Sequence, residues 1–214
     1  GDSAGGSAKQ ARNRETQAIL PLRGKILNVA SATADKLAGN KELADLVTAL
    51  GCGTGKHWRP DDLRYDKVIL MTDADVDGAH IAALLMTFFF RELPKLIERG
   101  HLYLAQPPLY RLAAGGSIAY ARNEADRERL LATQFKGKKN VEIGRFKGLG
   151  EMNPAQLKET TMDPARRQLL QVRSEDLDGN KPTAQLVEEL MGRRPELRLA
   201  FIQENARQVT ELDV

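Results

Sequence analysis

The sequence contains 214 residues, 42% of them hydrophobic, and is long enough to bury a core as one domain or as a domain with an extension. Its one cysteine, Cys52, excludes a disulfide framework and a cysteine-rich zinc site, and it favours a reducing compartment, by default the cytoplasm. No apolar run reaches the roughly eighteen residues of a membrane span, and residues 1–6 lack the features of a signal peptide, so we expect no membrane segment.

The net charge of +3 is spread unevenly along the chain. Basic side chains outnumber acidic ones by five to two in residues 1–30 and by nine to four in residues 131–173, whereas acidic ones lead by nine to five in residues 174–214. Two basic stretches suit binding to a polyanion. The same counts also fit lysines and arginines that only solvate helix faces.

The first half of the chain mixes helical and strand patterns. Small residues over 1–8 predict a loop, and Pro94 should kink or break the helix in which it lies. The short apolar run 67–71 predicts a buried strand. Helices are predicted at 9–14, 32–38, 41–50 and 78–99, and strands at 18–22 and 67–71.

The second half continues this mixture. A hairpin is predicted from residues 110–112 and 118–121, which flank Gly115-Gly116. Strands that alternate with helices indicate the α/β class. The other predicted elements are strands at 101–105 and 141–144 and helices at 123–133, 154–161, 182–192 and 195–207.

Three aspartates alternate in the run Asp73-Ala74-Asp75-Val76-Asp77, directly after a predicted strand. In an extended segment alternate side chains share a face, so the three carboxylates can converge. Neighbouring carboxylates repel one another unless a cation lies between them, and oxygen ligands favour a hard ion such as Mg²⁺. We therefore predict that Asp73, Asp75 and Asp77 bind a divalent metal. The alternative is that Asp77 caps the following helix and the other two are solvated.

Two other protein classes place aspartates in such a run. An EF-hand needs a helix before the loop and an acid at loop position 12, but here a strand precedes the loop and Leu84 takes that position. A phosphatase of the haloacid dehalogenase type would use Asp73 as a nucleophile. It would also need a lysine and an acidic pair after later strands, whereas Gln106-Pro107-Pro108 follows the next predicted strand.

Five ordered motifs resemble those of the B subunits of bacterial type II DNA topoisomerases, which contain a Toprim domain. Together they extend over about 165 residues. The similarity continues through residues 201–206 to the final Leu-Asp-Val. The motifs are Gly1–Gln10, Pro21–Asn28, Met71–Gly78, Gln106–Tyr110 and Phe146–Pro154, the last followed by Thr160–Pro164.

The resemblance implies a fold and a subfamily. We expect an α/β, Rossmann-like Toprim metal-binding domain at 1–107, shortened at its N-terminal side, with a mainly parallel sheet flanked by helices. A helical C-terminal tail region, an extension of the B subunit, is expected at 108–214. The segment Arg193–Arg198, and the absence after Gly150 of the large insertion of some gyrases, resemble topoisomerase IV B subunits more than gyrase B subunits, which stay the alternative.

The resemblance also implies a division of labour in DNA cleavage. In this family DNA is attacked by a tyrosine of the A subunit, while the B subunit holds Mg²⁺ beside the leaving 3′ oxygen. By resemblance, Asp73 and Asp75 are direct metal ligands and Asp77 is an outer or alternate ligand. The family's glutamate, a ligand and acid/base, lies immediately before the first motif, so we expect no catalytic residue in this chain and no cleavage by it alone.

Four residues correspond to expected DNA contacts. Lys25 and Asn28 match family positions that touch DNA, and both suit phosphate or sugar rather than bases. His80 resembles another such position, with capping or packing as its alternative. Arg193 is a candidate for contact with the DNA backbone, with a solvated helix face as its alternative.

Four further residues are candidates for a drug pocket or for contact with phosphate. Asp2 and Arg23 match positions that line the quinolone-sensitive pocket in related B subunits. Arg145 and Lys147 either reach phosphate or solvate a loop.

The resemblance finally implies cofactors and partners. ATP would be used by a separate N-terminal domain that this chain lacks. Double-stranded DNA and the A subunit of topoisomerase IV are the expected partners, in a heterotetramer of two A and two B subunits. Its expected task is relaxation and decatenation of the chromosome in the cytoplasm.

Overall fold

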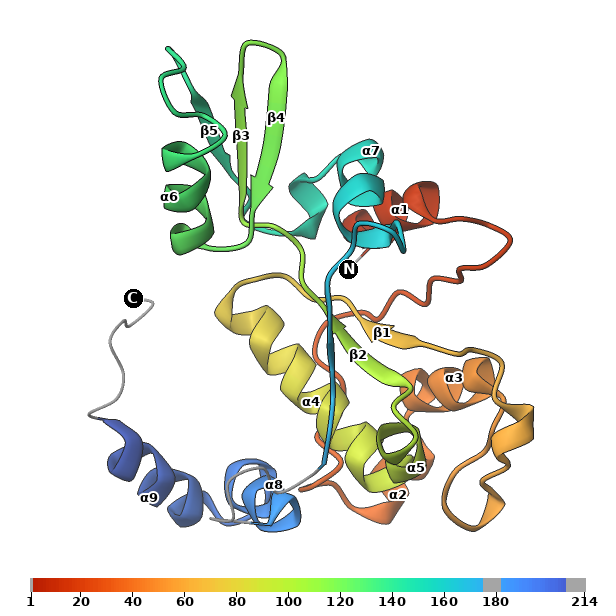
Figure 1. Cartoon of the computed structure of the whole chain (residues 1–214). Coiled ribbons are helices and arrows are strands. Elements are labelled where there is room, and N and C mark those ends of the chain that lie inside the picture. The colour runs from red at the N-terminus through yellow and green to blue at the C-terminus, as the bar shows by residue number, and fades with distance from the viewer. Residues whose placement is uncertain (1, 175–181, 207–214) are drawn as a thin grey trace. The chain divides into compact units, whose positions relative to one another are not determined.

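The computed structural model describes residues 2–174 and 182–206, except for the side chains of residues 2 and 3 (Figure 1). Contacts between residues divide the chain into two compact units. Unit 1 comprises residues 1–23, 69–79 and 104–170, and unit 2 comprises residues 24–68, 80–103 and 171–214. Both units are discontinuous in sequence. The expected domain boundary between residues 107 and 108 stays a prediction.

The elements confirm an α/β fold. The α-helices are α1 (Asp2–Ala11), α2 (Ala34–Ala38), α3 (Lys41–Leu50), α4 (Val76–Glu92), α5 (Pro94–Glu98), α6 (Glu124–Ala132), α7 (Pro154–Leu157), α8 (Thr183–Met191) and α9 (Pro195–Asn205). The strands are β1 (Val68–Leu70), β2 (Leu102–Ala105), β3 (Tyr110–Ala114), β4 (Ser117–Ala121), β5 (Glu142–Arg145) and β6 (Leu169–Gln171). Short turns of other helix types are η1 (Gly55–His57), η2 (Pro60–Asp62), η3 (Leu149–Glu151) and the π-helical η4 (Lys158–Met162).

One three-stranded sheet has the order β1-β2-β6. The helices α4 and α5 connect β1 to β2, as in a βαβ unit. Beside β2, strand β6 runs antiparallel, because Gln106 N–H donates to Gln168 O and Val172 N–H donates to Leu102 O. The sheet is therefore mixed, and β6 was not predicted. The strand predicted at 18–22 was wrong, since these residues form no strand.

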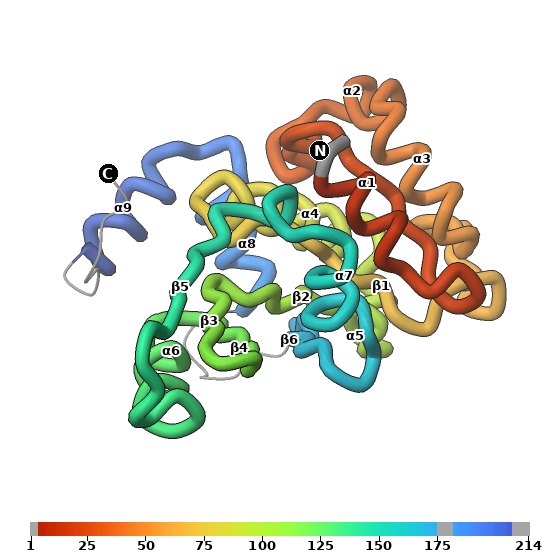
Figure 2. Tube along the Cα trace, turned by 90° about the horizontal axis from the view of Figure 1, so that it is seen from above, coloured from red at the N-terminus to blue at the C-terminus, as the bar shows by residue number. Residues whose placement is uncertain are grey.

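The second sheet lies within unit 1 and is antiparallel, with the order β4-β3-β5. Helix α6 packs against it (Figure 2) and closes a core around Leu112 and Ala121, both fully buried, with Leu130 and Phe135. The sequence predicted the β3-β4 hairpin and a strand at 141–144, but not their union in a separate sheet. The tail expected to be helical therefore begins with antiparallel strands, with α6 between β4 and β5 and the other helices after β5.

A second core of unit 1 forms beneath helix α1. Ala8 and Ala11 are 2% exposed and pack with Leu149, Met152 and Leu157. Both the loop predicted at 1–8 and the helix start at residue 9 were wrong. The small residues that suggested a loop let α1 approach closely: a Cβ on Gly5 would lie 3.1 Å from the Pro21 ring. Packing thus overrides the low helix propensity of glycine.

The core of unit 2 centres on helix α4. Phe88 and Phe89 are 2% and 0% exposed, and their rings meet edge to face with centroids 5.4 Å apart. The helix ends before Pro94, which begins α5, so the predicted break is confirmed. In the described part of the chain, no helix combines the length and the apolar character required to cross a membrane.

Candidate metal-binding loop and nucleic-acid contacts

The acidic run connects β1 to α4. Asp73, Asp75 and Asp77 are all exposed, and Asp77 already lies in the first turn of α4. All three belong to unit 1. The strand end and the helix start therefore present three carboxylates within five residues.

The loop that precedes η3 holds Asp73. One carboxylate oxygen, Oδ1, accepts a hydrogen bond of 2.7 Å from the backbone N–H of Leu149. Two glycines make room for this aspartate: a Cβ on Gly148 would lie 2.9 Å from Asp73 Oδ1, and a Cβ on Gly78 would lie 2.0 Å from the Asp73 carbonyl oxygen. Asp73 is thus fixed from two directions by close backbone contact.

Asp75 caps helix α4. Its Oδ1 accepts a hydrogen bond of 2.6 Å from Gly78 N–H, which is one of the N–H groups that the first helical turn leaves without a partner. The alternative interpretation of the run assigned this role to Asp77 and was wrong, because the helix begins at Val76 and Asp75 precedes it. As an acid in the first turn, Asp77 favours the helix through the macrodipole.

The role of the motif at 146–154 was missed in the sequence. Leu149 is 4% exposed and belongs to the core beneath α1, while its N–H binds Asp73. In the same loop, Lys147 N–H donates to Glu151 Oε2 at 2.7 Å. The glycines at 148 and 150 were the only signal in this motif of a close backbone approach. The motif supports the acidic run from 76 residues away in sequence.

The carboxylate oxygens of Asp73 and Asp75 are the type of ligand that Mg²⁺ prefers, and they would supply part of its coordination shell. Asp73 and Asp75 each use one carboxylate oxygen in a backbone hydrogen bond, and the other oxygen accepts no hydrogen bond from the described residues. Those residues contain no group of three His, Cys, Asp or Glu side chains gathered to hold a metal. Protein-bound Mg²⁺ usually takes only one or two carboxylates, with water and phosphate as its other ligands. Two exposed aspartates satisfy that requirement.

The four predicted DNA contacts all lie in unit 2. Lys25 and His80 are exposed. Lys25 directly follows Gly24, whose φ of 75° turns the chain. The His80 ring makes no hydrogen bond within the described residues.

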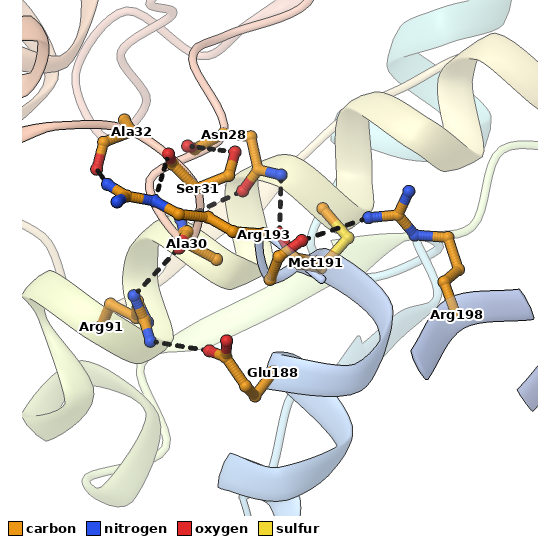
Figure 3. A network of polar contacts seen from close by, with 10 residues as sticks. Asn28, Ala30, Ser31, Ala32, Arg91, Glu188, Met191, Arg193 and Arg198 are labelled. Atoms are coloured by element: carbon orange, nitrogen blue, oxygen red, sulfur yellow. Dashed lines mark hydrogen bonds and ion pairs between the residues drawn. The ribbon is translucent and has the colours of Figure 1, made fainter. Parts of the chain in front are cut away.

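Asn28 and Arg193 have protein partners (Figure 3). The Asn28 amide donates to Met191 O at 2.9 Å, and its oxygen accepts from Ala30 N–H at 3.0 Å. The Arg193 guanidinium donates to Ser31 O at 2.9 Å and to Ala32 O at 2.8 Å. These bonds connect the segment after Asn28 to the end of α8.

A third contact reinforces this connection. Arg91 of α4 pairs with Glu188 of α8 at 3.3 Å and also donates to Ala30 O at 3.4 Å. Both side chains of the ion pair are about half exposed, so the pair adds little stability by itself. The hydrogen bonds of Asn28 and Arg193 therefore carry most of the polar connection.

Of the two residues expected in the drug pocket, the structure describes the side chain of Arg23 but not that of Asp2. The side chain of Asp2 lies outside the described residues, although its backbone begins α1. Arg23 is exposed and ends the first segment of unit 1. Their role in a drug pocket stays a prediction.

Two family models match the chain. The model of the Toprim domain matches residues 1–107, and the model of the DNA gyrase B subunit, carboxyl terminus, matches residues 138–203. The first covers the acidic run, and the second covers β5, the loop around Gly148 and helices α8 and most of α9.

Curated relatives match the chain over nearly its whole length. The B subunit of DNA topoisomerase 4 from Bartonella bacilliformis is 61% identical over the full chain, which covers 31% of that relative. The protein of the same name from Caulobacter vibrioides is 66% identical over 96% of the chain and 29% of the relative. The B subunit of DNA gyrase from Halalkalibacterium halodurans is 54% identical over the full chain and 33% of the relative. The chain thus spans about a third of the length of these relatives.

Proposed function

Because the chain belongs to the Toprim-containing family of type II DNA topoisomerase B subunits, we propose that it is the Mg²⁺-binding module for DNA cleavage and religation in such an enzyme. Asp73 and Asp75 hold the metal, and Asp77 lies beside them as an outer or alternate ligand. The observation that carries this proposal is that Asp73 and Asp75 each have one oxygen fixed by a backbone N–H, while the other oxygen accepts no hydrogen bond from the part of the chain that the structure describes.

The chain's own residues prepare the site. When bound, Mg²⁺ would stabilise the negative charge that develops on the leaving oxygen of a DNA phosphodiester. Leu149 N–H and the glycines at 78 and 148 hold Asp73 in one orientation before any ligand arrives. The capped start of α4 adds the positive end of a helix dipole, which favours phosphate.

The nucleophile and the remaining chemistry come from partners. We assign the attacking tyrosine to an A subunit, in an assembly of two A and two B subunits that acts on chromosomal double-stranded DNA in the cytoplasm. ATP hydrolysis belongs to another domain of the B subunit. The topoisomerase IV branch is favoured over gyrase by the higher identities of its members. Decatenation that exceeds supercoiling in the reconstituted enzyme would support this choice, and the reverse would contradict it.

The DNA contacts divide into two kinds. Lys25 and His80 are exposed on unit 2, and we assign them to the DNA backbone. Asn28 and Arg193 have protein partners through some of their donors. We assign them to DNA through their remaining donors, at positions that those same bonds hold in place.

Metal binding is tested with Mn²⁺, whose binding to the 214-residue chain can be followed by electron paramagnetic resonance. Asp73→Asn and Asp75→Asn keep the oxygen that accepts the backbone hydrogen bond but remove the charge. Each should weaken Mn²⁺ binding about tenfold or more, by analogy with lost outer-shell ligands. Glu151→Gln is the matched control, because it also accepts one backbone N–H in the neighbouring loop. Unchanged affinity in both aspartate variants would refute the proposed site.

The phosphatase alternative has little support, because the run at 73–77 lies within the part matched by the Toprim model. A phosphatase would hydrolyse phosphate monoesters with no other protein present. Such turnover by this chain, lost in Asp73→Asn, would restore that alternative.

A further inference from the structure

The segment 136–147 of unit 1 is strongly basic. It contains three lysines before β5, one arginine at the end of that strand and one lysine just after it, against the single acid Glu142. The basic residues are Lys136, Lys138, Lys139, Arg145 and Lys147.

In contrast, the charges of the neighbouring helix α6 and of Arg122, just before it, balance one another. Asp126 pairs with Arg122 at 2.8 Å and with Arg129 at 3.0 Å. Arg127 pairs with Glu128 at 2.8 Å and lies 3.6 Å from Glu124. The three acids of α6 are thus matched by Arg127 and Arg129 of the helix and by Arg122 just before it.

Four of the five basic side chains in that segment are exposed and unmatched. Within the described part of the chain, Lys136, Lys139, Arg145 and Lys147 make no side-chain hydrogen bond or ion pair. Lys138 differs, because its amino group donates to Ser117 Oγ at 2.6 Å and lies 5.0 Å from the centre of the Phe135 ring. The four unmatched residues form what we call the β5 basic surface.

The β5 basic surface follows an exposed sheet edge. β5 is the outer strand of the order β4-β3-β5, and all four of its residues are exposed. At about 3.3 Å per residue, a fully extended chain from Lys139 to Lys147 would cover at most ~26 Å, and the bend at residues 139–140, where Asn140 has a φ of 56°, shortens this distance. The segment leads directly into Gly148 and Leu149, whose N–H binds Asp73. Positively charged side chains therefore occur from the turn before β5 to Lys147, next to the loop whose Leu149 N–H binds Asp73.

We propose that the β5 basic surface binds the phosphate backbone of duplex DNA beside the metal site. This inference rests on the proposed function, which brings DNA to Asp73. At 3.4 Å per step, this maximum corresponds to at most about eight base pairs. Lysine and arginine side chains before, at the end of and after a strand suit contacts with phosphates and carry no base specificity. The charged residues Glu142 and Arg145 of β5 and the lysines that flank this strand also discourage pairing with another strand. The basic edge therefore suits a polyanion better than β-sheet addition.

The test measures how DNA affinity depends on salt. The 214-residue chain is titrated into a fluorescent duplex of about 30 base pairs by anisotropy over a series of KCl concentrations. Lys136→Ala/Lys139→Ala/Arg145→Ala should lower the slope of log K against log[KCl] by about 2–3, since each lost phosphate contact removes about 0.9. The matched control is Lys36→Ala/Lys41→Ala/Lys56→Ala, which removes three exposed lysines of unit 2. Its slope should change by less than about 1.

Several outcomes would overturn the inference. An unchanged slope in the first variant, or equal changes in both, would remove the β5 basic surface as a site. Polyglutamate that competes as well as DNA at equal charge would reject DNA as the partner. An unsubstituted chain that fails to bind the duplex at low salt would also reject it. Mn²⁺ binding at Asp73 and Asp75 is read separately, so the proposed metal site can stand when this inference fails.

Discussion

Replacement of Gly78 by alanine tests how tightly Asp73 is enclosed. A Cβ at this position would lie 2.0 Å from the Asp73 carbonyl oxygen, 2.7 Å from its carbonyl carbon and 2.9 Å from its nitrogen. These are backbone atoms, so a side-chain rotation cannot relieve the overlap. Overpacking of this kind costs about 1–3 kcal/mol. In an ordinary helix the same change would stabilise by about 0.5–1 kcal/mol.

The net effect should be a loss of about 1–2 kcal/mol in the free energy of unfolding. This corresponds to a fall in Tm of about 2–8 °C for a chain of this size. Gly6→Ala is the matched control, because Gly6 also lies in a helix and a Cβ there meets nothing within 4 Å. It should raise Tm. Calorimetry on both variants checks the pair, and a Gly78→Ala chain as stable as the unsubstituted chain would refute the enclosure of Asp73.

Three further predictions follow from single contacts. Asp75→Ala should lose about 1 kcal/mol of stability with its cap, whereas Asp75→Asn should keep it in urea unfolding, because asparagine also caps helices; equal losses would contradict the cap. Arg193→Ala should speed amide hydrogen exchange in α8, whereas Arg194→Ala, which among the described residues loses its ion pair with Glu196, should not. Burial and the hydrogen bond to Glu159 raise the pKa of Tyr120 to about 12. The folded state therefore favours the neutral phenol, and this stability is present below about pH 10 and lost as pH rises toward 12. Tyr120→Phe should remove that part of the alkaline fall in stability, and an unchanged pH dependence would contradict the shift.

Local patterns in the sequence predicted those elements whose signals are local. The break at Pro94, the hairpin at Gly115-Gly116 and the strand before Asp73 each depend on a few neighbouring residues. Helix α1 was misread because its glycines and alanines favour a loop by themselves and become helical through burial against residues 149–162. Its start could not be read without that partner.

The sequence predicted the residue types of the candidate site but not the long-range hydrogen bonds that hold them in place. The run at 73–77 identified oxygen ligands, but the hydrogen bond from Leu149 to Asp73 joins residues 76 positions apart. The bond from Asn28 to Met191 joins residues 163 positions apart. No periodicity encodes such pairs, because they arise only when separate segments pack. The helix cap is Asp75 and not Asp77, because sequence patterns place the start of a helix only to within a few residues.

The central claim is that Asp73 and Asp75 hold one metal ion through their open oxygens. Crystals of the chain grown with Mn²⁺ and a short DNA duplex test it directly by anomalous scattering. A single peak within about 2.3 Å of one oxygen of each aspartate is expected, close to the distances of hard divalent ions. A peak bound by neither carboxylate, or no peak with both side chains well ordered, would contradict the account.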